Sequence, residues 1–289
     1  MREVLGVKSL QQVLTQGEQS ITKSAEASKP PARQCPHCKK LLEPIQIAIL
    51  GQTRWGTVTC PCETKAREAL EKEKRRREWL TLCHEFTSRD KLLPKATLAN
   101  YEKRVGCTNA IKIANNFVDT YTEWLSERPG LGLYLNGPNG LGKTHLLTGI
   151  YKALMKRNVS AVFMTTYHMF QRFKEVGKVN DYEYEKRLLK VLYGCEVLLL
   201  DDVGGEVPYD SRAEKLLDVI NVRSQKRPII YSSNFTTGGL EQWMGNQGKR
   251  IADRILENAI TITLDGESNR GLINDEHHDW LAGRVKGLE

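Results

Sequence analysis

The sequence predicts an α/β protein in which a parallel five-stranded sheet is flanked by helices, with a small cysteine-containing domain before it. After about residue 108, five short apolar runs alternate with helical patterns, as in parallel strands covered by helices on both faces. Four of the seven cysteines gather near the N-terminus. With 289 residues and 40% hydrophobic composition, the chain has room for roughly two globular domains.

The composition also excludes several classes of protein. No apolar run reaches the ~18–20 residues of a membrane span. Residues 1–14 mix charges with apolar side chains and offer no small-residue cleavage site, unlike a secretory signal. We therefore expect a soluble cytoplasmic protein with no membrane partner. The net charge of +8 weakly favours an anionic partner.

Changes in sequence character divide the chain into four parts. Apolar residues recur at helical spacing as far as Leu14, and a Ser-, Gln- and Lys-containing stretch with Pro30-Pro31 then predicts a flexible connector. The predicted parts are an N-terminal helix and flexible segment (1–34), a zinc-binding segment (35–62), a charged helical linker (63–94) and a nucleotide-binding α/β domain (95–289).

The cysteine segment is predicted to bind zinc. A CxxC pair and a CxC pair are separated by 21 residues, and two close thiolate pairs brought together by a hairpin provide the four sulfur ligands that zinc prefers. Gly51 and Gly56 suit a hairpin that carries Trp55 and Val58. Free thiols are one alternative, and His37 in place of a cysteine is another. The four predicted ligands are Cys35, Cys38, Cys60 and Cys62.

The remaining cysteines and the charged stretch have simpler interpretations. Cys83, Cys107 and Cys195 have no partner nearby in sequence and are expected to be ordinary core or surface thiols. The stretch from Glu63 to Glu78 is dense in charge and lacks Gly and Pro, which predicts a solvated helix. An exposed linker helix is the favoured interpretation, and a basic ridge that faces DNA is the alternative.

The α/β domain is expected to begin with a helix that Thr108 caps and whose apolar stripe runs from Ile111 to Leu125. Apolar runs bounded by turn residues predict the strands that follow. The expected strands are Leu131–Leu135, Ala161–Met164, Val197–Leu200, Pro228–Tyr231 and Ile260–Leu264.

The segment after the first of these strands matches G-x-x-x-x-G-K-T and precedes a helical pattern. In that context, successive backbone N–H groups and the positive end of the helix bind a phosphate. Lys143 would reach the β- and γ-phosphates of ATP, and the Thr144 hydroxyl would ligate Mg²⁺. The predicted nucleotide-binding residues are Gly137, Pro138, Asn139, Gly140, Leu141, Gly142, Lys143, Thr144 and His145.

Hydrolysis also needs a carboxylate that holds the metal and a group that orients water. An apolar strand ends at Asp201, the expected Mg²⁺ partner through water, and Asp202, the candidate base. Asn234, at the tip of another strand, could contact the γ-phosphate or hold the lytic water, although a plain turn asparagine would look the same. Arg250 and Arg254 share a helix face and are candidates for a γ-phosphate contact or for surface ion pairs.

Together these motifs resemble the DnaC/DnaI helicase loaders and the related transposition helper IstB, within the AAA+ ATPases. The likeness spans roughly residues 95–270, and its later motifs are more specific to this group than the phosphate loop. The segments that carry it are 137–146, Leu200-Asp201-Asp202-Val203-Gly204-Gly205-Glu206, Ser232-Ser233-Asn234, Arg250-Ile251-Ala252-Asp253-Arg254-Ile255 and Gly266-Glu267-Ser268-Asn269-Arg270.

The resemblance implies roles for these residues and for the whole chain. It implies an ATPase that self-associates, grips single-stranded DNA and places a hexameric replicative helicase on it. DnaI-like loaders also carry an N-terminal zinc-binding domain that looks like the helicase-docking part. The implied roles are Walker A for Lys143 and Thr144, Walker B for Asp201 and Asp202, sensor 1 for Asn234, an arginine finger for Arg250 and sensor 2 for Arg254.

The sequence departs from the AAA+ pattern at Asp202, and two other functions are alternatives to helicase loading. AAA+ proteins often have Glu where Asp202 stands, so we expect slow turnover. An IstB-like transposition helper, which would bind duplex DNA and a transposase, is the first alternative, and the cysteine segment argues against it. The second is a zinc-dependent DNA-binding module that the ATPase half regulates. DNA contact is expected to be backbone-directed and salt-sensitive, because no stretch interleaves aromatic and basic residues.

Overall fold

A computed structural model describes residues 28–49, 52–102, 106–179, 181–205, 210–243, 247–268 and 280. Internal contacts divide the chain into two compact units, Met1–Arg76 and Arg77–Glu289. The helix predicted for the first 14 residues lies outside the described residues. Each unit is described by itself.

The N-terminal unit is built from two small antiparallel ladders. Strand β1 (Arg33–Gln34) pairs with β2 (Leu41–Leu42), and β3 (Ile45–Ile49) pairs with β4 (Gln52–Gly56). The predicted hairpin is therefore present, with Trp55 in β4 and Val58 beyond its end. The apolar core is small, because its buried members are only Cys35, Leu42 and Cys60 among the described residues. Such a core needs an additional cross-link to hold one structure.

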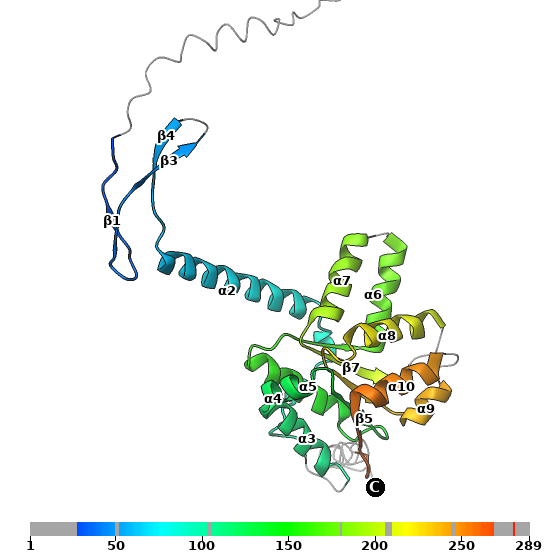
Figure 1. The fold of residues 1–289 in the computed structure, drawn as a ribbon. Coiled ribbons are helices and arrows are strands. Elements are labelled where there is room, and N and C mark those ends of the chain that lie inside the picture. The colour runs from blue at the N-terminus through cyan, green and yellow to red at the C-terminus, as the bar shows by residue number, and fades with distance from the viewer. Residues whose placement is uncertain are drawn as a thin grey trace, which may run out of the picture. The chain divides into compact units, whose positions relative to one another are not determined.

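The predicted charged helix is confirmed as α2 (Pro61–Glu85), which Figure 1 shows as one straight element. It runs seven residues beyond the predicted end at Glu78. The extension follows from packing, since Cys83 is fully buried in the core of the second unit and Trp79 and Leu82 pack against that core. The exposed remainder of α2 keeps the expected solvated character.

The second unit contains the predicted five-stranded sheet, and every pairing in it is parallel. Its strand order is β6-β7-β8-β5-β9. The strands are β5 (Gly132–Asn136), β6 (Ala161–Thr165), β7 (Val197–Val203), β8 (Ile229–Ser233) and β9 (Ala259–Thr263). Strand β7 is longer than predicted, because it continues through both acids to Val203, with a register irregularity against β8 after Leu200.

Helices cover both faces of the sheet, as Figure 1 shows. Alternate strand residues point to opposite faces, so Leu133 packs with one layer of helices whereas Tyr134 packs with the other. None of the described helices has the length and apolar character of a membrane span. The helices are α3 (Thr108–Asp119), α4 (Tyr121–Glu127), α5 (Lys143–Lys156), α6 (Thr166–Val179), α7 (Tyr182–Gly194), α8 (Asp210–Arg223), α9 (Thr237–Trp243) and α10 (Gly248–Asn258), with a 3₁₀ turn at Arg89–Lys91.

The helix predicted from Thr108 to Leu125 is wrong in two details. Cys107, not Thr108, occupies the N-cap position, and the helix breaks at Thr120, where α3 ends and α4 begins. At that break, the Thr120 hydroxyl donates to the Asn116 carbonyl at 2.8 Å. The same carbonyl also accepts the Thr120 N–H at 2.9 Å, and a hydroxyl bond of this kind, added to the backbone bond, tends to bend a helix.

Candidate nucleotide-binding site

The predicted phosphate loop lies between β5 and α5, where two glycines are required by their surroundings. Gly137 has φ +146°, and a Cβ there would lie 2.2 Å from the Leu264 carbonyl oxygen. Gly142 has φ +81°, and a Cβ there would lie 2.8 Å from the Tyr101 ring. Left-handed backbone and close approach together favour glycine. The loop is therefore held in a compact turn directly before the N-terminus of α5, which favours an anion.

Lys143 begins α5 and turns its side chain back over the loop. Its Nζ donates to the carbonyl oxygens of Gly137 at 2.6 Å and Pro138 at 2.7 Å, and the side chain is buried. A buried ammonium is costly unless it is well hydrogen-bonded or faces an opposite charge. The Lys143 ammonium thus lies beside the loop, where phosphate oxygens could accept its hydrogen bonds in place of the two carbonyl oxygens.

Thr144 and Asp201 are brought together from α5 and β7. The Thr144 hydroxyl donates to Asp201 Oδ2 at 2.9 Å, and Asp201 is only 5% exposed. Ser232, from the neighbouring strand β8, donates to the other carboxylate oxygen, Oδ1. A hydroxyl beside a buried carboxylate is the oxygen pair that holds Mg²⁺ in phosphate-loop enzymes. The residues fit a nucleotide-bound magnesium ion in their chemistry.

Burial raises the pKa of Asp201 above the ordinary range of aspartate, and the hydrogen bonds from Ser232 and Thr144 offset this only in part. Asp202 is adjacent in sequence and also raises the pKa of Asp201 through like charge. A carboxylate in this situation gains from a nearby cation. The pKa shift thus agrees with a role in metal binding.

Asp202 differs from Asp201 in its exposure and in its backbone conformation. It is exposed, its backbone is left-handed with φ +57°, and its N–H donates to Ser232 Oγ at 3.0 Å. Thr166 donates to the Asp202 carbonyl at 2.9 Å. A Cβ on Gly205 would lie 2.3 Å from Asp202 Oδ2, so glycine makes room for the carboxylate. The Asp202 carboxylate is therefore open to solvent while the backbone of the residue is held by two hydrogen bonds.

Asn234 follows β8 and lies beside Asp202, with Nδ2 to Oδ1 at 3.5 Å, a long hydrogen bond. Its neighbour Phe235 is anchored, because the Tyr134 hydroxyl donates to the Phe235 carbonyl at 2.7 Å and its ring stacks on Trp243. Asn234, the predicted sensor residue, thus lies next to Asp202, the candidate base, and is followed by the anchored residue Phe235.

His145 follows Thr144 in α5 and contacts a different segment. Its Nε2 lies 2.9 Å from the Thr97 carbonyl and 3.1 Å from Asn100 Oδ1. Tyr101 in turn donates to the Leu141 carbonyl at 2.8 Å. His145 therefore links the start of α5 to residues 97–101 through hydrogen bonds.

The two arginines of α10 lie on its exposed side, apart from the contacts described above. Arg250 donates to Gln247 Oε1 at 3.0 Å, and Arg254 forms an ion pair with Glu257 at 2.6 Å. In the described residues neither arginine is brought to the phosphate loop of its own chain. An exposed Arg250 suits a contact with a second chain, whereas Arg254 is held in a surface ion pair.

Sequence reasoning gave no role to Ser232, although it hydrogen-bonds both aspartates. The available signal was its position, since it precedes Ser233-Asn234 on the strand expected to neighbour the acids. Glu206, Asn269 and Arg270, which contributed to the resemblance, lie outside the described residues.

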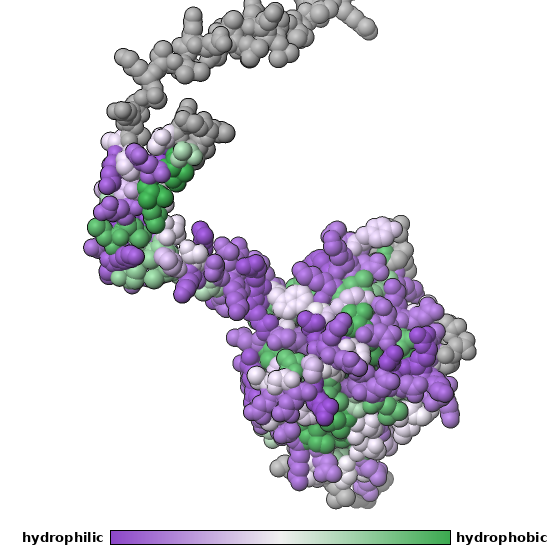
Figure 2. Space-filling view, in the orientation of Figure 1, coloured by the Kyte–Doolittle hydropathy of each residue, from purple (hydrophilic) through white to green (hydrophobic). Residues whose placement is uncertain are grey.

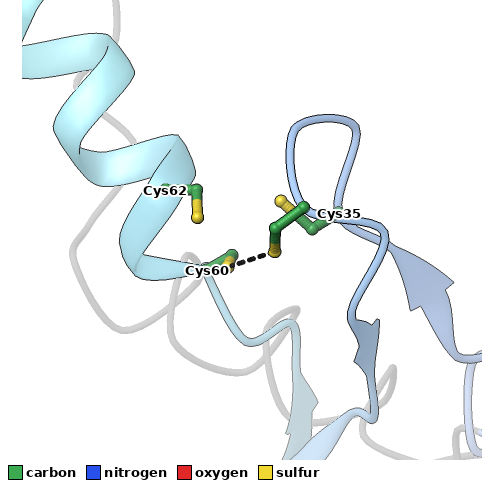
Figure 3. Close-up of side chains that lie close together, drawn as sticks. Cys35, Cys60 and Cys62 are labelled. Atoms are coloured by element: carbon green, nitrogen blue, oxygen red, sulfur yellow. Dashed lines mark hydrogen bonds between the residues drawn. The ribbon is translucent and has the colours of Figure 1, made fainter.

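The four predicted zinc ligands converge in the N-terminal unit. Their sulfur atoms all lie within 4.8 Å of one another, and Cys38 Sγ and Cys60 Sγ are 3.6 Å apart. Zn–S bonds of about 2.3 Å in a tetrahedron imply sulfur–sulfur distances of about 3.8 Å. Figure 3 shows Cys60 and Cys62 at the start of α2, turned toward the loop that carries Cys35. The cluster fits one tetrahedral zinc ion.

An ion pair supports this cluster from outside. Arg33 donates to Glu63 Oε2 at 2.7 Å and to the Val58 carbonyl at 3.0 Å. Glu63 also accepts from the Cys60 N–H at 2.9 Å. The hydrogen bond from Arg33 lowers the pKa of Glu63 to about 2. Outer contacts of this kind orient metal ligands.

Comparison with known proteins agrees with this geometry. A family model described as IstB-like ATP binding protein matches residues 62–275, which is most of the chain. The chain belongs to the IstB-like ATP-binding proteins. Its fold is the AAA+ fold predicted from the sequence, and the site lies within the matched residues.

The relatives of this IstB-like protein fall into two groups, which are named as replicative helicase loaders and as insertion-sequence ATP-binding proteins. The replicative helicase loader DnaI of Bacillus subtilis is 31% identical over 166 residues, 54% of this chain and 51% of that protein. The putative ATP-binding protein of insertion sequence IS232 from Bacillus thuringiensis is 30% identical over 137 residues, 46% of this chain and 53% of that protein. The chain thus spans about half the length of these curated relatives.

Solved structures resemble the same unit. A crystal structure of DnaI has a TM-score of 0.52 and 31% identity, and the match covers 64% of this chain and 95% of that one. A crystal structure of the DnaC helicase loader has the same TM-score at 24% identity, with 60% and 98% covered. The second likeness shows the fold alone.

Proposed function

We propose that this IstB-like protein is an ATPase that self-associates and loads a hexameric replicative helicase onto single-stranded DNA. Bound ATP would supply the γ-phosphoryl group that is transferred to water, and Mg²⁺ would neutralise the charge on the phosphate oxygens. Lys143, Thr144 and Asp201 would bind the nucleotide and metal, while Asp202 and Asn234 would orient the attacking water. The observation that carries the ATPase assignment is the Thr144–Asp201 contact beside the phosphate loop.

Self-association is supported by the position of Arg250. It is exposed and lies away from its own chain's phosphate loop, so a site supplied with an arginine would need a second chain. Arginine that stabilises charge on a transferred phosphoryl group can be supplied in trans. Asp202, shorter than the glutamate that many AAA+ proteins have, supports slow hydrolysis, with the ATP state acting as a switch.

The helicase as partner is supported by the relatives named as replicative helicase loaders and by the N-terminal cysteine cluster. Zinc held by Cys35, Cys38, Cys60 and Cys62 would fix the small unit that, by resemblance to DnaI-like loaders, docks the helicase. Structural zinc contributes directly to the folding of such small units.

A transposition helper is the second candidate function. Matches to insertion-sequence ATP-binding proteins have nearly the same identity as those to the loaders, and the family description names IstB. Under this function the chain would bind duplex DNA and a transposase, and the cysteine cluster would have another role.

Co-purification with a hexameric replicative helicase, with and without ATP, tests the proposal. The full-length protein should retain the helicase, and the variant Cys35→Ser/Cys38→Ser should lose it. A His37→Ala variant is the matched control, because it alters the same turn without removing a predicted ligand. Retention of a transposase instead of the helicase would favour the second function.

Nucleotide binding is tested separately. Lys143→Ala should abolish ATP binding in a filter assay, whereas Lys156→Ala, at the far end of the same helix, should leave it unchanged. Wild-type affinity in the Lys143 variant would refute the site, whatever the result with the helicase.

A further inference from the structure

Most of the chain's positive charge belongs to its smaller unit. Residues 1–76 contain 14 Lys and Arg against 8 Asp and Glu, a net charge of +6 out of +8 for the whole chain. The other 213 residues therefore carry only +2. Net charge concentrated on one part of a protein draws polyanions to that part.

Part of this charge forms a stripe on α2. Cys62, Lys65, Ala69, Lys72 and Arg76 follow one another at spacings of three and four residues, so they share one helix face. Lys65 and Lys72 are exposed, and neither forms an ion pair with any described residue. Because Cys62 belongs to the cysteine cluster, the stripe begins at the cluster and runs along the helix.

The opposite face of α2 has a different character. Arg67, Glu71, Lys74 and Glu78 alternate in sign along it at spacings of four, three and four residues, and Arg75, which lies beside this face, pairs with Glu71 at 3.8 Å. Pairs of this spacing neutralise each other locally. Basic residues thus occur on all sides of α2, but the stripe itself contains no acidic residue, because Glu68 and Glu73 lie on its two flanks.

The spacing of the stripe matches a phosphate backbone. With a rise of about 1.5 Å per residue, Lys65 and Arg76 lie about 16 Å apart along the axis, which spans several successive phosphates at about 3.4 Å or more per nucleotide. Exposed Lys39 and Lys40 follow Cys38 directly and add charge at the cluster end. Figure 2 shows hydrophilic residues over the visible face of α2.

We propose that Lys65, Lys72 and Arg76, extended by Lys39 and Lys40, bind the phosphodiester backbone of DNA. The stripe would give the protein a DNA contact outside its ATPase unit. The proposal rests on the proposed function for the choice of DNA as the polyanion, and on the structure for the residues.

Fluorescence anisotropy with the full-length protein tests it, using a labelled oligothymidine and a duplex of equal length across a salt series. The variant Lys65→Gln/Lys72→Gln/Arg76→Gln should bind at least about ten-fold more weakly, with a smaller salt slope, since each lost phosphate contact removes about 0.7–0.9 from that slope. Arg67→Gln/Lys74→Gln/Arg77→Gln removes the same charge from the other sides of the same helix and should bind like the wild type. Zinc content and thermal unfolding should be the same in both variants.

Weaker binding of either oligonucleotide by the stripe variant alone supports the proposal. The oligonucleotide whose binding weakens, single-stranded or duplex, identifies the form of DNA that the stripe binds. Equal weakening in both variants overturns the proposal, because net charge alone would then explain binding. If the wild type binds neither oligonucleotide, the DNA-binding part of the proposed function fails as well. Stripe-dependent binding of polyglutamate with equal affinity would overturn the assignment to DNA.

Discussion

The Thr144 hydroxyl donates to Asp201 Oδ2 at 2.9 Å, which joins the start of α5 to strand β7. Removing this hydroxyl with Thr144→Val should weaken Mg²⁺-dependent ATP binding by about 1.5–3 kcal/mol, the range for a hydrogen bond to a charged group. Thr144→Ser keeps the hydroxyl and should bind nearly as the wild type does. Titration of ATP with and without EDTA measures the effect. Equal Mg²⁺ dependence in the two variants would remove Thr144 from the metal site.

The raised pKa of Asp201 predicts a specific pH dependence. Burial favours the protonated acid, so protons compete with Mg²⁺ at a higher pH than the ~3.9 of an ordinary aspartate. Without metal, this carboxyl contributes stability at low pH and loses it as the pH rises through its raised pKa. Mg²⁺-dependent ATP affinity should therefore fall as the pH is lowered toward that pKa. Binding measured in EDTA at each pH is the control, and a flat Mg²⁺ effect down to pH ~4 would contradict the prediction.

Ser232 and Ser233 form a matched pair on adjacent positions of β8. Ser232 hydrogen-bonds Asp201 and Asp202, whereas Ser233 donates to the Val203 carbonyl at the end of the same strand, β7. Each alanine variant should cost about 1–3 kcal/mol of stability, seen as a lowered Tm. Only Ser232→Ala should also lower kcat for ATP hydrolysis. An equal fall of kcat in Ser233→Ala would show that loss of stability explains the lower kcat of both variants.

The exposed position of Arg250 predicts hydrolysis shared between chains. Arg250→Ala should bind ATP as the wild type does but hydrolyse it more slowly, since an arginine supplied in trans acts on the transition state. Mixing it with Lys143→Ala should restore part of the turnover, because one chain then offers an intact loop and the other an intact arginine. Lys249→Ala is the neighbouring control. A mixture no more active than its parts would mean that Arg250 does not serve a second chain's site.

Much of this architecture follows from local sequence patterns. Four of the five strands are apolar runs that the sheet buries almost completely, whereas the edge strand β9 exposes Ile260, Thr261 and Thr263. The loop at 137–144 lies between a strand and a helix as its motif requires. Patterns of this kind are visible because burial on both faces leaves no polar alternation.

Other features depend on contacts that a sequence pattern does not contain. The extension of α2 follows from Trp79 and Cys83 packing on a distant core, and the break between α3 and α4 falls at Thr120, whose hydroxyl and N–H both donate to the Asn116 carbonyl. The left-handed conformation of Asp202, which turns two adjacent acids to different tasks, arises where β7 loses its register with β8. Ser232 could be assigned only once the register between β7 and β8 was known, because that register places its hydroxyl beside both acids.

The convergence of four sulfur atoms predicts a structural zinc ion whose loss unfolds the N-terminal unit. Metal analysis should find about one zinc per chain, and Cys35→Ser/Cys38→Ser should lose it, because two thiolates cannot complete a tetrahedral site. Glu63→Gln should retain zinc but release it to a chelator more readily, since Glu63 accepts from the Cys60 N–H and pairs with Arg33. His37→Ala should keep the wild-type content. Unchanged zinc in the double variant would exclude this cluster, whereas zinc lost only in His37→Ala would move a ligand to the imidazole.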